Sequence, residues 1–178
     1  MHLQWVTVMN KLAFGCSHTY GIGVEPTEAW PSLLDAINLG VPGCSIDLIA
    51  RILPSMLDKY TPHIVYILWP DWTRFEYIEH GIYKQSLPMD SNRIYFMEKA
   101  TDEWLQNNYL EQVEKIRKSC CEIELIDITL YDLIPFIDHA DKWPISKLGH
   151  HYNHEWHQWV ANIFRDKAQW ITNHRHFV

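Results

Sequence analysis

A serine near the N-terminus stands in a short stretch of glycine and hydroxyl residues that could support nucleophilic chemistry. The stretch is Gly15-Cys16-Ser17-His18-Thr19, and it follows the apolar run Leu12–Phe14. A chain that leaves a strand and turns into a helix presents one small side chain at the edge of the sheet, with free backbone N–H groups beside it. Ser17 is therefore a candidate nucleophile, which needs a base for its proton and donors for the oxyanion. The alternative is that Ser17 merely caps the helix that follows it.

Three histidines and one aspartate before or at the start of the last predicted helix could complete a catalytic site. They are His150, His151, His154 and, further upstream, Asp141. A neutral imidazole within hydrogen-bond reach can accept the proton of a serine, and a carboxylate can hold that imidazole in the right tautomer. The same histidines, with His157, sit near helical spacing. That spacing is compatible with a metal site but is more typical of a solvated helix face.

Length and composition predict one globular domain over residues 1–178. Hydrophobic residues make up 47% of the 178 residues, which is enough for a sizeable core. The formal net charge of −7 argues against broad binding to nucleic acid or to an anionic membrane. No apolar run approaches the roughly 18 residues of a membrane span. Residues 1–8 are interpreted as a dispensable extension, because Met9 lies just before the first predicted strand.

Cysteine usage and the N-terminus favour a cytoplasmic protein. The cysteines lack CxxC metal spacing and are predicted to be reduced thiols. The N-terminus has no basic segment followed by a long apolar one, so a secretory signal is not expected. Cys16 is interpreted as a packing residue, and its use as the nucleophile is a minor alternative. The cysteines are Cys16, Cys44, Cys120 and Cys121.

Predicted strands alternate with predicted helices, which indicates a parallel sheet covered on both faces. We expect an irregular insertion or hairpin over residues 70–100, with a lid over the site as one interpretation. One helix is split or kinked by Pro54 in this prediction. The predicted strands are Lys11–Phe14, Ala36–Leu39, Ile64–Trp69 and Ile123–Ile128. One predicted helix opens at residues 25–31 and runs to Ile37. The other three predicted helices are capped by Ser45, Thr101 and Asn153.

Four turns follow one another in an order that resembles the SGNH/GDSL hydrolase superfamily, in particular its small members that begin with Gly-Cys-Ser. They are the Gly-x-Ser-x-Thr turn, the Asn-x-Gly-x-x-Gly turn at 38–43, the polar turn at 70–74 and the His-rich turn before the last helix. The resemblance covers roughly residues 11–164. It implies a flavodoxin-like three-layer α/β/α sandwich with a mostly parallel sheet. It also implies ester hydrolysis by Ser, His and Asp, without a metal or cofactor.

Two of the turns match the family closely enough to carry residues over. Ser17 matches the nucleophile, and its own N–H would serve the oxyanion hole. Gly43 matches the glycine whose N–H completes that hole, because a residue without Cβ lets the backbone approach a substrate. Cys16 stands where the family's acidic residue usually lies.

The third turn departs from the family pattern Gly-x-Asn-Asp. The matching residues are 69–72, with Asp71 where an asparagine would donate to the oxyanion. A carboxylate there would repel the oxyanion unless it is protonated or turned away. Losing one such donor costs about 2.7–4 kcal/mol in the barrier. Thr73 or Arg74 could act as substitute donors.

The fourth turn lacks the family's Asp-x-x-His. The pattern His-x5-His-x3-Ala places His151 at the base, with His157 and Ala161 behind it, and the residue three before it is Leu148. Asp141 is the nearest upstream carboxylate. An alternative register puts residues 141–144 on the motif and leaves no base. His150 and His154 remain alternatives to His151.

These residues and turns are compatible with three classes of function, of which the first two are favoured. The first is a serine hydrolase that forms an acyl-Ser17 intermediate and acts on small acyl esters. Acetylated sugars are a candidate substrate, because nine tryptophans could supply an aromatic platform. The second is a binding protein on the same fold that has lost hydrolysis. The third is a metal-binding protein that uses His150, His154 and His157.

Overall fold

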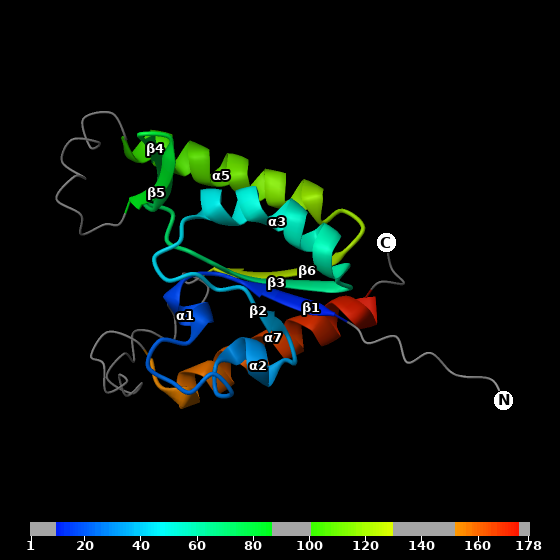
Figure 1. Ribbon diagram of the computed structural model, residues 1–178. Coiled ribbons are helices and arrows are strands. Elements are labelled where there is room, and N and C mark those ends of the chain that lie inside the picture. The colour runs from blue at the N-terminus through cyan, green and yellow to red at the C-terminus, as the bar shows by residue number, and fades with distance from the viewer. Residues whose placement is uncertain (1–9, 87–100, 130–151, 175–178) are drawn as a thin grey trace.

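A four-stranded parallel sheet forms the centre of the protein (Figure 1). The computed structural model describes residues 10–86, 101–129 and 152–174, so Asp141, His150 and His151 lie outside the described residues. The strand order is β2-β1-β3-β6, and every pairing is parallel. The strands are β1 (Lys11–Phe14), β2 (Ile37–Asn38), β3 (Ile64–Trp69) and β6 (Glu124–Thr129).

Helices cover both faces of this sheet and complete a three-layer α/β/α sandwich (Figure 1). On one face lie α3 (Ile46–Tyr60) and α5 (Asp102–Ser119). On the other face lie the short helices α1 (Ser17–Tyr20) and α2 (Trp30–Leu33), together with α7 (His154–His174). The predicted fold class is confirmed.

Two hydrophobic clusters, one on each face, hold the layers together. Successive strand residues point to opposite faces. Leu12 and Phe14 therefore pack under α3 and α5, whereas Ala13 packs towards α2 and α7. The second cluster is aromatic: Trp30 stacks on Phe164 with ring centroids 4.6 Å apart. Burial on both faces explains why β3 is an unbroken apolar run.

The three predicted helix caps are confirmed. Ser45 accepts a hydrogen bond from the N–H of Leu48, Thr101 from Trp104, and Asn153 from Trp156. Each cap satisfies a backbone donor that the first turn of a helix leaves unpaired. These caps set where α3, α5 and α7 begin.

Pro54 does not split its helix, contrary to one form of the prediction. α3 runs unbroken through Pro54. A proline in a helix removes one backbone donor and crowds the carbonyl one turn earlier. Pro54 is exposed, so water can satisfy that carbonyl.

Three predicted elements need corrected boundaries. The second strand, predicted over Ala36–Leu39, spans only Ile37–Asn38. The helix expected to open at residues 25–31 and reach Ile37 spans only Trp30–Leu33, because Asp35 has a left-handed φ of 54° and the N–H of Ala36 returns to the Pro31 carbonyl. The last strand begins and ends one residue later than predicted, at Glu124 and Thr129. The N–H of Ile123 still bonds the Cys120 carbonyl within the turn after α5.

An antiparallel hairpin occupies the first part of the predicted insertion. Strands β4 (Phe75–Glu79) and β5 (Ile82–Ser86) pair through a two-residue turn, His80-Gly81. Both turn residues have positive φ, 51° and 76°, which is typical of a type I′ hairpin turn. The hairpin interpretation is confirmed for these residues. Residues 87–100, with the turn expected at 88–93, lie outside the described part, and the lid remains a prediction.

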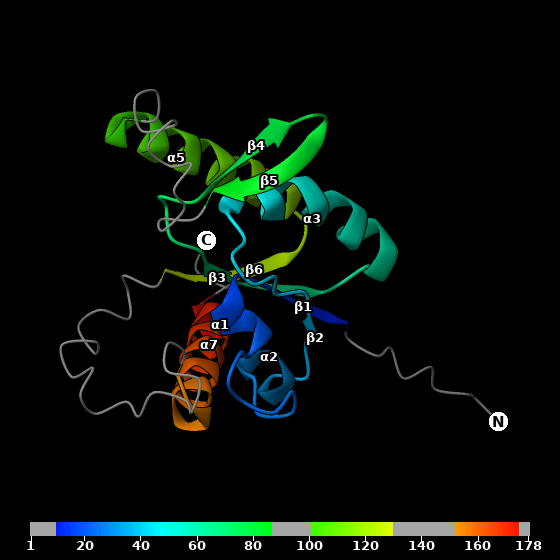
Figure 2. The same cartoon turned by 60° about the vertical axis from the view of Figure 1, so that its left-hand side comes forward.

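The hairpin lies beside α3 and α5 (Figure 2), and polar contacts hold it there. Asp47 of α3 accepts hydrogen bonds from the N–H of Glu76 and from Asn108 of α5. The Glu76 carboxylate binds Arg51 of α3 through two hydrogen bonds of 3.0 and 2.7 Å. The start of the hairpin is therefore held beside the N-terminal half of α3.

None of the helices within residues 10–86, 101–129 and 152–174 combines the length and apolarity that a membrane crossing requires.

Candidate active site

Ser17 lies at the carboxyl edge of the sheet, where β1 ends and α1 begins. It is the first residue of α1, where a backbone N–H has no acceptor within the helix. Its side chain is buried, with 8% exposed. The cap position belongs to Cys16 and carries no side-chain capping bond, so the interpretation of Ser17 as a helix cap is wrong. Cys16 is fully buried in the core, as its interpretation as a packing residue requires.

Gly15 lets three elements meet behind this serine. Its φ is +154°, and an added Cβ would lie 2.0 Å from Oγ1 of Thr19 and 2.7 Å from the carbonyl oxygen of Leu68. Contacts that short do not occur between real atoms, so only glycine fits. The spacing Gly-x-Ser-x-Thr thus reflects α1 folding back over the end of β1, against the end of β3.

Replacing Gly15 with alanine is expected to lower the free energy of unfolding by about 2–5 kcal/mol, because the Cβ overlaps backbone and forces strain. Urea denaturation measures this. Gly81→Ala is the matched control: Gly81 also has positive φ, but an added Cβ meets nothing within 4 Å. The control should lose only about 1–2 kcal/mol, from φ alone. Equal losses in the two variants would contradict the close approach at Gly15.

The second turn braces the first. The side-chain amide of Asn38 donates to the carbonyls of Thr19 and Tyr20, at 3.0 and 3.2 Å. Gly40 lies so close to α1 that an added Cβ would be 2.4 Å from the Tyr20 nitrogen. The N–H of Val41 donates to the Gly15 carbonyl at 2.9 Å. The turns after β1 and β2 therefore form one contiguous surface, as their order in a parallel sheet predicts.

Gly43 lies within this second turn. Its φ of 75° is a left-handed conformation that favours glycine. The next residue, Cys44, donates its thiol hydrogen to the Gly15 carbonyl at 3.2 Å. Burial, the largest cause, raises the pKa of Cys44 to about 12, so the thiol stays protonated at neutral pH and keeps this bond. Gly43 is thereby held next to the turn that carries Ser17.

Asp71, in the third turn, directs its carboxylate to its own loop. Oδ1 accepts hydrogen bonds from the backbone N–H and the hydroxyl of Thr73, at 2.8 and 2.5 Å. This is an Asx turn with a second bond from the same residue. An ionised carboxylate only accepts hydrogen bonds, so Asp71 in that form supplies no donor to an oxyanion.

The histidines of the last helix differ in environment. His154 is the first residue of α7 and is exposed. His157 is 1% exposed, and its Nδ1 accepts the backbone N–H of Trp30 at 3.2 Å. The interpretation of a solvated helix face therefore holds for His154 and is wrong for His157, which joins α7 to α2. Among the described residues, no group of three or more His, Cys, Asp or Glu side chains could hold a metal ion.

His18, which sequence reasoning did not single out, connects α1 to the start of α7. Its ring lies 5.4 Å from those of Tyr152 and Trp156, which stack on each other at 4.8 Å. Figure 2 shows α1 beside α7. The residue after Ser17 therefore contacts the residue after His151. The sequence signal that could have indicated this contact is the aromatic pair Tyr152 and Trp156, on either side of the N-terminus of α7.

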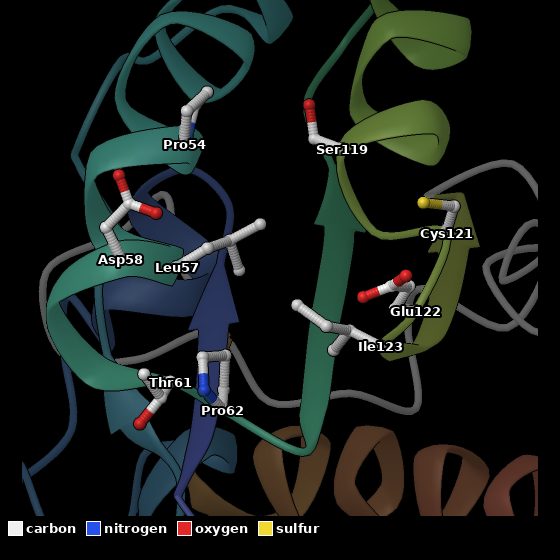
Figure 3. Close-up of a pocket in the computed structure, with 9 residues that line it drawn as sticks. All are labelled: Pro54, Leu57, Asp58, Thr61, Pro62, Ser119, Cys121, Glu122 and Ile123. Atoms are coloured by element: carbon white, nitrogen blue, oxygen red, sulfur yellow. The ribbon is translucent and has the colours of Figure 1, made fainter.

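Two hollows differ in their relation to the site. The larger, about 650 Å³, lies between the end of α3 and the turn into β6, at the amino ends of the strands and away from Ser17 (Figure 3). The smaller, about 430 Å³, lies at the carboxyl end of β6 beside the third turn. Its lining residues are Trp72, Gln106, Tyr109, Leu110 and Thr129. Only the smaller hollow is placed to receive part of a substrate bound at this edge.

The parallel sheet and its two helical layers make a fold that solved structures share, among them a G-D-S-L family protein and a carbohydrate esterase. TesA aligns with 89% of this chain and 97% of its own, with a TM-score of 0.57 and 12% identity. A G-D-S-L family protein from Desulfitobacterium hafniense aligns over 88% and 97%, with a TM-score of 0.54 and 10% identity. A family 3 carbohydrate esterase from Clostridium thermocellum aligns over 89% and 94%, with a TM-score of 0.53 and 15% identity.

These likenesses extend over nearly the whole of each chain, and at such identities they show the fold alone. No protein-family model matches the sequence, and no curated protein matches it. The small Gly-Cys-Ser type of the family stays a prediction.

Proposed function

We propose that this chain is a serine esterase or acylhydrolase with Ser17 as its nucleophile. The observation that carries the proposal is the placement of Ser17. It is the first residue of a helix at the carboxyl edge of the sheet, and the next residue, His18, packs against Tyr152. That contact brings the chain that follows His151 to the nucleophile's turn.

The proposed reaction proceeds through an acyl-serine. Oγ of Ser17 attacks the ester carbonyl carbon while its proton passes to the imidazole of His151, and the carbonyl electron pair moves onto oxygen. When the carbonyl re-forms, the bond to the alkoxy group breaks and the imidazolium returns the proton to the leaving alcohol. Water repeats the two steps and releases the acid. Asp141 is the proposed carboxylate that holds the imidazole, with His150 and His154 as alternative bases.

Two backbone donors are proposed for the oxyanion. They are the N–H groups of Ser17 and Gly43, whose turns are in contact through the bonds to the Gly15 carbonyl. Asp71 occupies the third position of the hole and, when ionised, offers no donor. The site therefore needs a further donor if it is to reach the usual stabilisation.

Small acyl esters are the proposed substrates, with acetylated sugars as the first class to test. The aromatic hollow beside the third turn supports this choice, because rings of Trp and Tyr stack on flat or apolar ligand faces. One structural neighbour is itself a carbohydrate esterase. The proposal includes one domain over residues 1–178 and a cytoplasmic location.

A binding protein without hydrolysis is the second candidate. The observation that favours it is the Asp71 carboxylate at a position where esterases of this fold are expected to have a donor. It predicts that a ligand binds without turnover.

Labelling with a fluorophosphonate probe separates the two functions. The esterase predicts a labelled wild-type chain and no label on Ser17→Ala, because the probe phosphonylates only an activated serine. The absence of label from the wild-type chain would favour the binding protein, and label that persists on Ser17→Ala would place the nucleophile elsewhere.

A further inference from the structure

Arg74, in the third turn, is partly buried and has two side-chain nitrogens without a partner among the described residues. Its backbone N–H donates to the Asp71 carbonyl at 3.1 Å, so it stands directly before β4. Its Nε and Nη1 atoms are buried and have no hydrogen-bond partner within residues 10–86, 101–129 and 152–174. Burying donors of a cation without an acceptor costs free energy, so the arrangement is suited to an anion.

The topology indicates where this charge acts, because Arg74 belongs to the turn that follows β3. The end of β3 lies against the turn that carries Ser17, since an added Cβ at Gly15 would be 2.7 Å from the Leu68 carbonyl oxygen. Consistent with this placement, burial raises the pKa of the Cys44 thiol and the positive charge of Arg74 acts against that rise. Cys44 bonds the Gly15 carbonyl and directly follows Gly43. The turn that carries Arg74 therefore lies at the same edge of the sheet as both turns that offer backbone N–H groups to the proposed oxyanion.

The polar side chains closest to Arg74 in the sequence, Thr73 and Glu76, are hydrogen-bonded to other residues and not to the Arg74 guanidinium. The hydroxyl of Thr73, the other substitute donor, gives its hydrogen to Asp71 at 2.5 Å. Glu76, two residues further along, has a side chain only 7% exposed, and its carboxylate is bound by Arg51 and Gln85. Among residues 10–86, 101–129 and 152–174, no carboxylate forms an ion pair with Arg74.

We propose that Arg74 is a catalytic residue that donates to the negative charge formed on the substrate carbonyl oxygen, in place of the asparagine that this chain lacks. The inference rests on the proposed esterase activity. A guanidinium suits the role, because its several N–H groups hold an oxyanion firmly and its charge persists at all working pH values. Because the charge forms only in the transition state, Arg74 should act mainly on kcat.

Kinetics with p-nitrophenyl acetate test this role. Arg74→Ala should lower kcat on the order of 10²–10³-fold and change KM less than about threefold. Arg74→Lys should recover part of kcat, since the charge returns without the planar donors. Lys84→Ala, which removes a cation on the same hairpin that is paired with Glu79, should leave kcat unchanged. An unchanged kcat, or a rise in KM alone, in Arg74→Ala would overturn the proposal.

Binding of inorganic sulfate gives a readout that needs no turnover. Isothermal titration should find one sulfate site in the wild-type chain and in Lys84→Ala, weakened at least tenfold in Arg74→Ala. Circular dichroism establishes that each variant is folded, and the lysine variant serves if the alanine variant is not. Sulfate binding that is absent, or equal in all variants, overturns the role of Arg74. A wild-type chain that binds sulfate but hydrolyses no ester would instead refute the proposed esterase while supporting an anion receptor.

Discussion

Ser17→Ala is expected to lower kcat for p-nitrophenyl acetate on the order of 10⁴-fold or more. The reason is that alanine has no atom to form the acyl intermediate, and what remains is the stabilisation by the oxyanion donors alone. Steady-state kinetics measure the loss. A smaller loss, below about tenfold, would contradict the assignment of the nucleophile.

Stability serves as the control for this variant. Within the described residues no hydrogen bond ties the Ser17 hydroxyl to the fold, so its removal should change the free energy of unfolding by less than about 1 kcal/mol. Ser32→Ala is a matched replacement at an exposed serine, whose hydroxyl donates to the Pro26 carbonyl. It should keep kcat within about twofold.

His151→Ala is expected to lower kcat/KM on the order of 10³-fold or more, because serine is a weak nucleophile without a base. Stopped assays of the wild-type chain and of the variant over a range of substrate concentrations measure the loss.

The neighbouring histidines are the controls for the base. His150→Ala and His154→Ala should each retain kcat/KM within a few-fold. His154 is exposed at the start of α7, so its replacement should be well tolerated in the fold. If His154→Ala loses activity and His151→Ala does not, then His154 is the base.

Local signals account for the parts of the fold that sequence reasoning predicted well. Caps such as Ser45 and Thr101 act within one turn, and the apolar periodicity of α3 depends on its own spacing. The order of the turns predicted that the residues after β1 and β2 meet, because parallel strands bring their carboxyl ends to one edge. The contacts of Gly15 with Val41 and Cys44 are that meeting.

Long-range contacts account for what was missed. His157 is buried because its Nδ1 accepts a bond from Trp30, 127 residues away, and nothing in the local pattern of α7 marks this. α2 is shorter than predicted because Asp35 turns the chain into β2. For Asp71, the sequence predicts a carboxylate turned away from the oxyanion as one alternative. It does not predict that Thr73 donates two hydrogen bonds to that carboxylate. The roles of His151 and Asp141 remain predictions.

The pairing of Arg51 with Glu76 has a consequence for the neighbouring turn. Arg51 of α3 binds the carboxylate of Glu76, whose side chain is only 7% exposed and which lies two residues after Arg74 in the chain. An arginine that is paired with a carboxylate of the fold attracts an anionic ligand only weakly. The proposed role of Arg74 therefore depends on Arg51, a residue that takes no part in the proposed chemistry: it holds Glu76 at α3 and so leaves the guanidinium of Arg74 available to a ligand.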